Sequence, residues 1–198
     1  MLLRPEDIIE CLKIVPKRKE HLRGHVPSAI LMIFFNKENK THLVYIRRTQ
    51  DMTLHSGQMA FPGGKIDSDD ATSYAAAVRE TNEEIGVSEK EYRYLGDMGF
   101  FHTFTTRYDA AAHLVWSSKR PKYKTNKIEV AEVIEIPLTV LLQQFRPDVD
   151  FNNAQELWYL NFKYKPPNSS KTANLWGLTA RITHHFMQGL ATFLQNRN

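Results

Sequence analysis

The segment from residue 71 to residue 86 restricts the fold more than any other part of this 198-residue chain. At about 100° per residue, residues 71–85 form an amphipathic helix with one mostly apolar stripe that can pack on a sheet. The members of that stripe are Tyr74, Val78, Thr81 and Ile85. The opposite stripe is acidic, with two small residues one turn earlier: Glu80, Glu83, Glu84, Ala76 and Ala77. Gly86 is expected to end the helix, because glycine tolerates the left-handed conformation.

Three glutamates on one helix face repel one another, at a cost of roughly 0.2–0.5 kcal/mol for an i,i+4 pair in an isolated helix. A bound divalent cation would offset this repulsion, and clustered carboxylate oxygens suit Mg²⁺ or Mn²⁺. A solvated amphipathic helix is the alternative, because glutamate-rich helix faces are common. The run from Asp67 to Asp70 precedes the helix, where acids are expected to cap the first backbone N–H groups. These residues alone leave both alternatives open.

The wider pattern resembles the Nudix box, in which a glycine precedes an acid and then Arg-Glu-x-x-Glu-Glu-x-Gly-apolar. Its matching positions are Gly64, Arg79, Glu80, Glu83, Glu84, Gly86 and Val87. The chain departs from the pattern at Asp70, where the pattern has Glu, and by one extra residue between Gly64 and Arg79. The resemblance implies an α/β fold: a Nudix-type α/β/α sandwich with a mixed sheet and a loop–helix–loop box. It also implies a pyrophosphohydrolase, with residues 1–198 as one domain and the box at about 64–87.

The extra residue and the flanking motifs resemble the Nudix subgroup that hydrolyses coenzyme A and its derivatives. Residues 57–64 match its Gly-x-x-x-Phe-Pro-Gly-Gly pattern, and residues 129–133 and 175–182 are also similar to it. Thr53 departs from it, because the pattern has a second Arg there. The resemblance implies cleavage of coenzyme A into 3′,5′-ADP and 4′-phosphopantetheine. The alternatives are a hydrolase of ADP-ribose, NADH or another nucleoside diphosphate derivative, and a non-catalytic Nudix module that senses a nucleotide.

Hydrolysis of a pyrophosphate requires positive charge at the phosphoryl oxygens and a base for the attacking water. Glu80, Glu83 and Glu84 are the expected metal ligands, with the carbonyl of Gly64 as a further ligand. Among later acids, Glu129 is the expected general base, because it lies where a loop enters a strand. Glu132 and Glu135 are the alternatives for that role.

The remaining site residues have supporting roles. Arg79 is expected to pair with an acid near the helix start, such as Asp70, and to stabilise the loop. Gly63 and Gly64 allow the backbone to approach a metal or phosphate closely, because they lack a Cβ. The cations expected to contact substrate phosphates are Arg48, Lys65 and Arg107, all of which could equally be surface residues.

The rest of the chain alternates predicted strands and helices, which indicates an α/β sandwich. Residues 28–36 form a continuous apolar run, typical of a buried strand, and residues 37–40 supply the turn to its partner. The predicted strands cover residues 28–36, 42–49, 92–101, 107–117, 128–136 and 156–164. The predicted helices outside the box cover residues 5–15, 138–145 and 174–195.

Composition excludes several classes of protein. The formal net charge is +4 with the charges scattered, so no nucleic-acid patch is expected. Cys11 is the one cysteine, which excludes an intramolecular disulfide and fits a reducing compartment. The N-terminus is charged where a signal peptide is apolar, and no run approaches the roughly 18 apolar residues of a membrane span. We therefore expect a cytoplasmic protein with a small-molecule substrate and no membrane or nucleic-acid partner; a homodimer is compatible with the sequence.

The aromatic and histidine residues outside the box are expected to be structural. His184 and His185 are adjacent on the closing helix, so they face different directions and suit surface or edge packing better than a metal pair. The tryptophans Trp116, Trp158 and Trp176 are expected in the core.

Overall fold

The computed structural model describes residues 1–50, 57–149, 156 and 160–197. Within these residues, seven strands form a mixed sheet in the order β3-β2-β1-β6-β5, with β4 paired to β1 and β7 paired to β2. The strands are β1 (Val26–Lys37), β2 (Lys40–Arg48), β3 (Met59–Ala60), β4 (Gly63–Lys65), β5 (Tyr92–His102), β6 (Tyr108–Ser117) and β7 (Val130–Pro137). β1 and β6 run parallel, whereas the other pairs are antiparallel. The predicted mixed sheet is confirmed.

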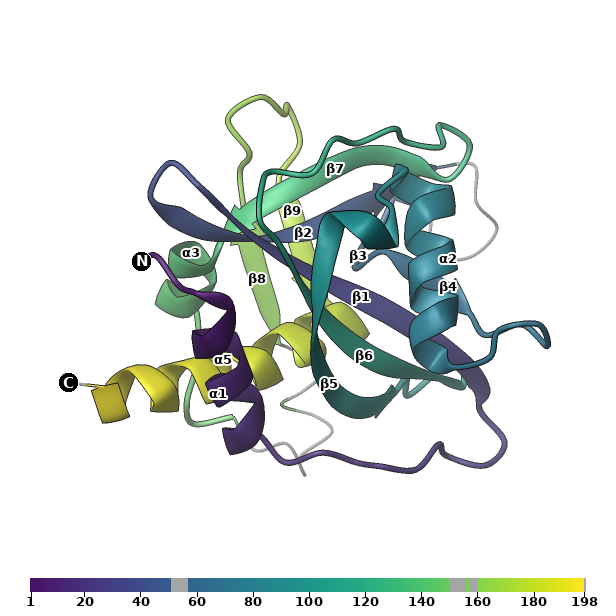
Figure 1. The fold of residues 1–198 in the computed structure, drawn as a ribbon, viewed down its shortest axis with the longest axis horizontal. Helices are drawn as coiled ribbons and strands as arrows, with labels where there is room; N and C mark the ends of the chain where they lie inside the picture. Colours follow the sequence, from purple (N-terminus) through teal and green to yellow (C-terminus); the bar gives the residue numbers. More distant parts are fainter. Residues whose placement is uncertain (51–56, 150–155, 157–159, 198) are drawn as a thin grey trace.

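Helices cover both faces of the sheet, which confirms the α/β/α arrangement (Figure 1). The helix α2 (Ser73–Ile85) packs on one face. The opposite face is covered by α1 (Pro5–Ile14), α3 (Leu138–Gln143) and α5 (Gly177–Arg197). A short 3-10 helix, η1 (Glu89–Glu91), leads into β5, and a separate two-stranded sheet joins β8 (Asn161–Tyr164) to β9 (Ala173–Trp176). None of the helices in the described ranges combines the length and apolar character that crossing a membrane requires.

The apolar run in β1 is buried because its side chains alternate between two cores. Met32 and Phe34 point toward α1 and α5, and the ring of Phe34 lies 4.9 Å from that of Phe186. Leu31 and Ile33 pack with α2 on the other face. A strand with period-2 geometry can be apolar throughout only where both sheet faces are covered, so this run places β1 at the centre of the fold.

Several predicted boundaries change in the structure. The box helix begins at Ser73 rather than residue 71, because the hydroxyl of Thr72 accepts a hydrogen bond from the Ala75 N–H (3.0 Å). The predicted capping by the preceding acids is therefore wrong. The closing helix begins at Gly177, because residues 174–176 belong to β9. The predicted strand over 156–164 is confirmed at residues 161–164; residue 156 is helical, and 157–159 lie outside the described residues.

Two predictions about aromatic side chains are wrong. His184 and His185 are buried rather than at the surface or an edge, and their Nε2 atoms hydrogen-bond to the backbone carbonyls of Arg146 (2.7 Å) and Pro16 (2.8 Å). Trp176 is 45% exposed, whereas Trp116 is buried as predicted. Trp158 lies outside the described residues.

The helices α1 and α5 cross at Gly189. A Cβ at this position would lie 2.8 Å from the carbonyl oxygen of Cys11 and 2.9 Å from the Val15 side chain. We expect Gly189→Val to destabilise the protein by about 1–3 kcal/mol, because the larger side chain forces the helices apart. Gln188→Val, at the exposed neighbouring position, should change stability by less than about 0.5 kcal/mol. Urea unfolding of both variants measures this, and equal midpoints would contradict the close crossing.

Candidate metal and substrate site

The side of α2 that faces the sheet differs from the predicted apolar stripe. Its buried residues are Ala76, Ala77, Thr81, Glu84 and Ile85, whereas Tyr74 and Val78 are only partly buried. The prediction that all three glutamates lie opposite the packed face is wrong, because Glu84 is only 1% exposed. The physical reason is the size of the side chains. Ala76 and Ala77 allow the helix to approach the sheet closely, and this turns Glu84 inward.

Two consecutive glycines join the box loop to the sheet and to α2. Gly63 has a φ of 145°, and a Cβ there would lie 2.2 Å from the carbonyl oxygen of Ala29 on β1. A Cβ on Gly64 would lie 2.4 Å from the Glu80 carboxyl carbon. The Gly63 N–H donates a hydrogen bond to Oε2 of Glu84 (2.9 Å). The close approach expected of these glycines is therefore made to β1 and to the carboxylates of α2.

Burial shifts the pKa values of two carboxyl groups on α2, those of Glu80 and Glu84. Burial raises the pKa of Glu84 to about 8, against an ordinary value of 4.5, because the charged form loses its hydration. The negative charges of Glu80 and Glu129 raise this pKa further, while the Gly63 N–H and the Arg48 guanidinium, 3.6 Å away, oppose the change. Burial also raises the pKa of Glu80, despite its bond to Arg79. Three carboxylates thus lie close enough to repel one another.

Arg79 connects these acids to the loop before the helix. Its Nε and Nη2 donate to the two carboxylate oxygens of Asp70 (3.2 and 2.9 Å), and this pairing lowers the pKa of Asp70. The predicted Arg79–Asp70 pair is confirmed. Arg79 Nη1 also donates to Glu80 (3.1 Å) and to Glu83 (3.3 Å), and Nη2 donates to the Lys65 carbonyl (3.1 Å). One guanidinium therefore holds both ends of the box.

Gly86 ends the helix in the left-handed conformation, with a φ of 69°. Its N–H donates to the Asn82 carbonyl (2.9 Å), so the predicted helix end is confirmed. Residues 124 and 126 then hydrogen-bond through their N–H groups to the carbonyls of Ile85 and Glu84 (2.8 and 2.9 Å). These bonds bring the segment that leads to Glu129 next to the end of α2.

The donor chemistry of this cluster fits a hard divalent cation, because it offers carboxylate oxygens that are partly buried and mutually repulsive. In the part of the chain that the structure describes, no three His, Cys, Asp or Glu side chains converge as a ready-made ligand set. Two of the expected ligands, Glu80 and Glu83, accept hydrogen bonds from Arg79. The Glu83 side chain is 57% exposed and is not among the residues that line the adjoining cavity.

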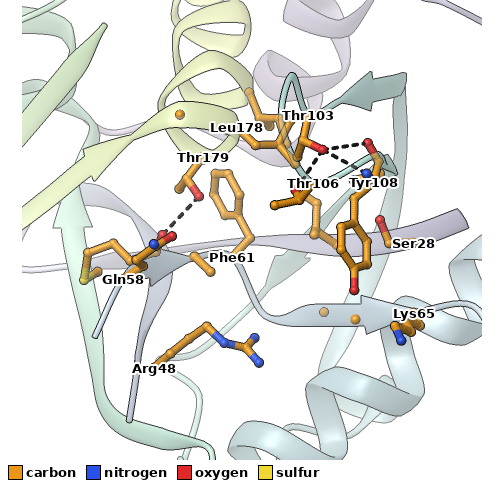
Figure 2. A pocket seen from close by; sticks show the side chains of 18 of the residues that line it. Ser28, Arg48, Gln58, Phe61, Lys65, Thr103, Thr106, Tyr108, Leu178 and Thr179 are labelled. Atoms are coloured by element: carbon orange, nitrogen blue, oxygen red, sulfur yellow. Dashed lines mark hydrogen bonds between the residues drawn. The ribbon is translucent and has the colours of Figure 1, made fainter. Parts of the chain in front are cut away.

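A cavity of about 630 Å³ opens beside the glutamates (Figure 2). Figure 2 shows Arg48 and Lys65 toward one end, Phe61 in the middle, and Thr103, Thr106 and Leu178 toward the other end. The apolar lining consists mainly of Ile30, Met59, Phe61, Phe104, Ala110, Trp176, Leu178 and Ile182. The charged lining residues are Arg48, Lys65, Asp67, Glu80, Glu84, Glu129 and Arg181. The cavity therefore combines an acidic end with a long apolar wall.

The predicted substrate and base residues fall in different places. Arg48, Lys65 and Glu129 line the cavity, whereas Arg107 is exposed and does not. The alternative bases also lie outside the lining: Glu132 accepts a hydrogen bond from Arg47 (3.2 Å), and Glu135 accepts one from Arg120 (2.7 Å). Thr53 lies outside the described residues.

Sequence reasoning missed the wall formed by residues 103–108 and by the start of α5. The run Thr103-Phe104-Thr105-Thr106 carries no motif, and it reaches the cavity only because β5 and β6 pair in an antiparallel hairpin. Residues 175–182 contributed to the subgroup resemblance, but they had no predicted role in the site. Within them, the Thr179 hydroxyl donates to the Met59 carbonyl (3.1 Å).

Comparison with known proteins identifies the family. The protein-family model described as the NUDIX domain matches residues 25–158, which is more than half of the chain. The chain is 28% identical over 163 residues to a Schizosaccharomyces pombe protein named "Probable nudix hydrolase", covering 82% of this chain and 55% of that protein. It thus spans about half the length of that relative. It is 30% identical over 164 residues to the Yersinia pestis "Uncharacterized Nudix hydrolase NudL", covering 81% of this chain and 78% of the relative.

Solved structures share the fold at low sequence identity. A Caenorhabditis elegans Ap4A hydrolase binary complex superimposes with a TM-score of 0.53 at 13% identity, covering 86% of this chain and 98% of that one. A MutT/nudix family protein from Enterococcus faecalis gives a TM-score of 0.56 at 11% identity, covering 98% and 80%. With the glycine pair, the acidic helix and the cavity in one place, and with the family model matching across them, the chain belongs to the Nudix hydrolase family.

Proposed function

We propose that this Nudix hydrolase cleaves the pyrophosphate bond of coenzyme A or its derivatives, giving 3′,5′-ADP and 4′-phosphopantetheine. One observation carries the proposal. Two of the segments that resemble the coenzyme A subgroup, residues 57–64 and 175–182, line the same cavity although they lie far apart in sequence. The hydrogen bond from Thr179 to the Met59 carbonyl joins them. Segments that share a subgroup resemblance and a cavity wall are most simply explained by a shared ligand.

The chemistry of the cavity suits such a ligand. Its acidic end, with Arg48 and Lys65 nearby, provides groups for a metal and for phosphate oxygens. Its apolar wall, which includes Met59, Phe61 and Leu178, can cover a base or a pantetheine arm. A ligand with a charged centre and a long, partly apolar arm therefore matches the two zones.

Nudix hydrolases use divalent metal cations, and the carboxylates of Glu80, Glu83 and Glu84 with the Gly64 carbonyl are the groups that would hold Mg²⁺ or Mn²⁺ here. A bound cation supplies positive charge that offsets the repulsion between a pyrophosphate and an attacking water. Glu80 and Glu83 accept hydrogen bonds from Arg79, so they reach a cation only by exchanging that partner. Arg48 can donate to phosphate oxygens, because its Nε is buried without a partner in the described structure.

Glu129 is the residue that we propose accepts a proton from the attacking water. The Asn126 amide donates to its Oε1 (3.1 Å), and the Thr49 N–H donates to its backbone carbonyl (2.9 Å). These bonds hold the side chain at the cavity, near Glu80 and Glu84. A general base must be within reach of the water it deprotonates, and Glu129 lines the cavity whereas Glu132 and Glu135 do not.

We expect Glu83→Gln and Glu84→Gln each to lower kcat by at least about a hundredfold while the fold is retained. The reason is the loss of a cation ligand and of negative charge next to the cavity. Asp69→Asn is the matched control, because it removes one exposed charge beside the box without touching the cavity. Turnover and thermal melting are measured together with Mg²⁺ and Mn²⁺. Millimolar metal should raise the melting midpoint of the wild type more than that of Glu84→Gln. Near-wild-type turnover in both glutamine variants would exclude the ligand assignment.

Glu84 also predicts a pH dependence of stability in the presence of a chelator. Its folded-state pKa of about 8 lies above the ordinary value of 4.5. The stability that protonated Glu84 contributes is therefore complete below about pH 4.5 and is lost as the pH rises to about 8. Glu84→Gln removes this loss, so its melting midpoint relative to wild type should rise by several degrees between pH 5.5 and 8.5. Asp69→Asn should follow the wild type. A constant difference between Glu84→Gln and wild type would contradict the raised pKa.

The substrate assignment predicts that coenzyme A is cleaved with a higher kcat/KM than ADP-ribose, by about tenfold or more. The apolar wall should contact the pantetheine arm, which ADP-ribose lacks. Initial rates on coenzyme A, ADP-ribose and NADH, with identification of 3′,5′-ADP among the products, measure this. A tenfold preference for ADP-ribose would reject coenzyme A as the substrate, while absence of turnover on the whole panel would favour a nucleotide-sensing module.

A further inference from the structure

Arg181 is a buried cation that no carboxylate of the described residues neutralises. It lies in the second turn of α5, is 7% exposed and lines the cavity. Its Nη1 donates to the His102 carbonyl (2.7 Å), and its guanidinium carbon lies 4.4 Å from the centre of the Phe104 ring. Within the described part of the chain, its Nε is buried without a hydrogen-bond partner. Among the described residues, no Asp or Glu lies within 4.0 Å of its guanidinium nitrogens.

The surroundings of Arg181 disfavour its charge. Burial lowers its pKa to about 10, because the guanidinium loses hydration, and the positive charge of Arg18 lowers it further. The carboxylate of Asp109, opposite His102 across the hairpin, is already engaged. It pairs with Arg18 and with His21 (2.9 Å), and it accepts the Leu22 N–H (2.7 Å). A buried cation without a counter-ion is costly, so an anion that enters the cavity would gain from meeting it.

Arg181 lies in the part of the cavity that residues 103 and 104 line. Its two contacts, His102 and Phe104, flank Thr103, which Figure 2 shows across Phe61 from Arg48. The charged residues with the largest effect on the pKa of Glu84 are Arg48, Glu80 and Glu129. One substrate molecule would therefore meet the acidic end and Arg181 with different groups.

We propose that Arg181 binds a phosphomonoester of the substrate that is separate from the pyrophosphate, and that it makes the enzyme select substrates carrying this group. The inference rests on the proposed function, under which the group is the 3′-phosphate of coenzyme A. A guanidinium suits this role, because its N–H groups form a planar fork that matches phosphate oxygens.

The test compares substrate pairs that differ by one phosphomonoester: coenzyme A with dephospho-coenzyme A, and NADPH with NADH. In the wild type, kcat/KM should favour the phosphorylated member by roughly tenfold to a hundredfold, the size of a charge-assisted hydrogen bond. In Arg181→Gln this ratio should fall to about one, with kcat/KM on dephospho-coenzyme A changed by less than about threefold. Arg181→Lys, which keeps the charge, should retain part of the preference. Arg23→Gln, at an exposed position outside the cavity lining, should behave as the wild type.

A second measurement separates this proposal from the proposed function. Calorimetric binding of 3′,5′-ADP and of 5′-AMP, with a chelator present, needs no turnover. The wild type should prefer 3′,5′-ADP, and Arg181→Gln should lose that preference. If coenzyme A is not cleaved but this difference is found, the substrate assignment fails and the role of Arg181 stands.

Two outcomes would overturn the proposal. An equal loss of kcat/KM on both members of each pair in Arg181→Gln would mean that Arg181 only holds the 103–108 wall through His102 and Phe104. An unchanged ratio would mean that Arg181 does not contact the phosphomonoester. Melting curves check that the variants fold, and Arg181→Lys supplies the same comparison if Arg181→Gln does not.

Discussion

The close contact of Gly63 and Gly64 with β1 and α2 is the constraint on which the rest of the site depends. There is no room for a Cβ on either residue, because the Ala29 carbonyl and the Glu80 carboxylate occupy that space. The loop therefore lies directly between the strand and the helix, and its Gly63 N–H reaches Glu84. Burial of Glu84, the position of Phe61 in the cavity wall and the approach of α2 to the sheet all follow from this contact.

Charge is separated across the cavity. The carboxylates of Glu80, Glu84 and Glu129 lie together in one part of the cavity lining. Arg79 lies outside the lining and balances part of the negative charge, because it forms ion pairs with Asp70, Glu80 and Glu83. Arg181 lines the cavity beside His102 and Phe104, and no carboxylate of the described residues pairs with it. A bound cation would reduce the repulsion between the carboxylates, and a bound anion would neutralise the charge of Arg181. An extended substrate with a pyrophosphate and a further charged group would therefore complement both parts of the cavity.

Sequence patterns predicted the elements whose signals are local. The buried strand over 28–36, the acidic helix and its end at Gly86 rest on periodicity and on glycine, which act within a few residues. The strands β3, β4 and β9 were not predicted, because each has four residues or fewer and exists only through pairing with distant segments. The inward face of α2 was predicted incorrectly for a related reason. Periodicity places side chains around a helix, but the shape of the partner surface decides which side packs.

The sequence by itself determined which chemical groups this protein carries: the glutamates and glycines of the Nudix box, and enough flanking motif to indicate a subgroup. The tertiary structure alone decided what those groups can do. It buried Glu84 and raised its pKa, turned Glu83 toward Arg79, and left Arg107 outside the cavity. It also brought Arg181 to the cavity wall. The physical reason is that protonation, accessibility and ligand contact depend on hydration and on neighbouring charges, and both are set by segments that are remote in the chain.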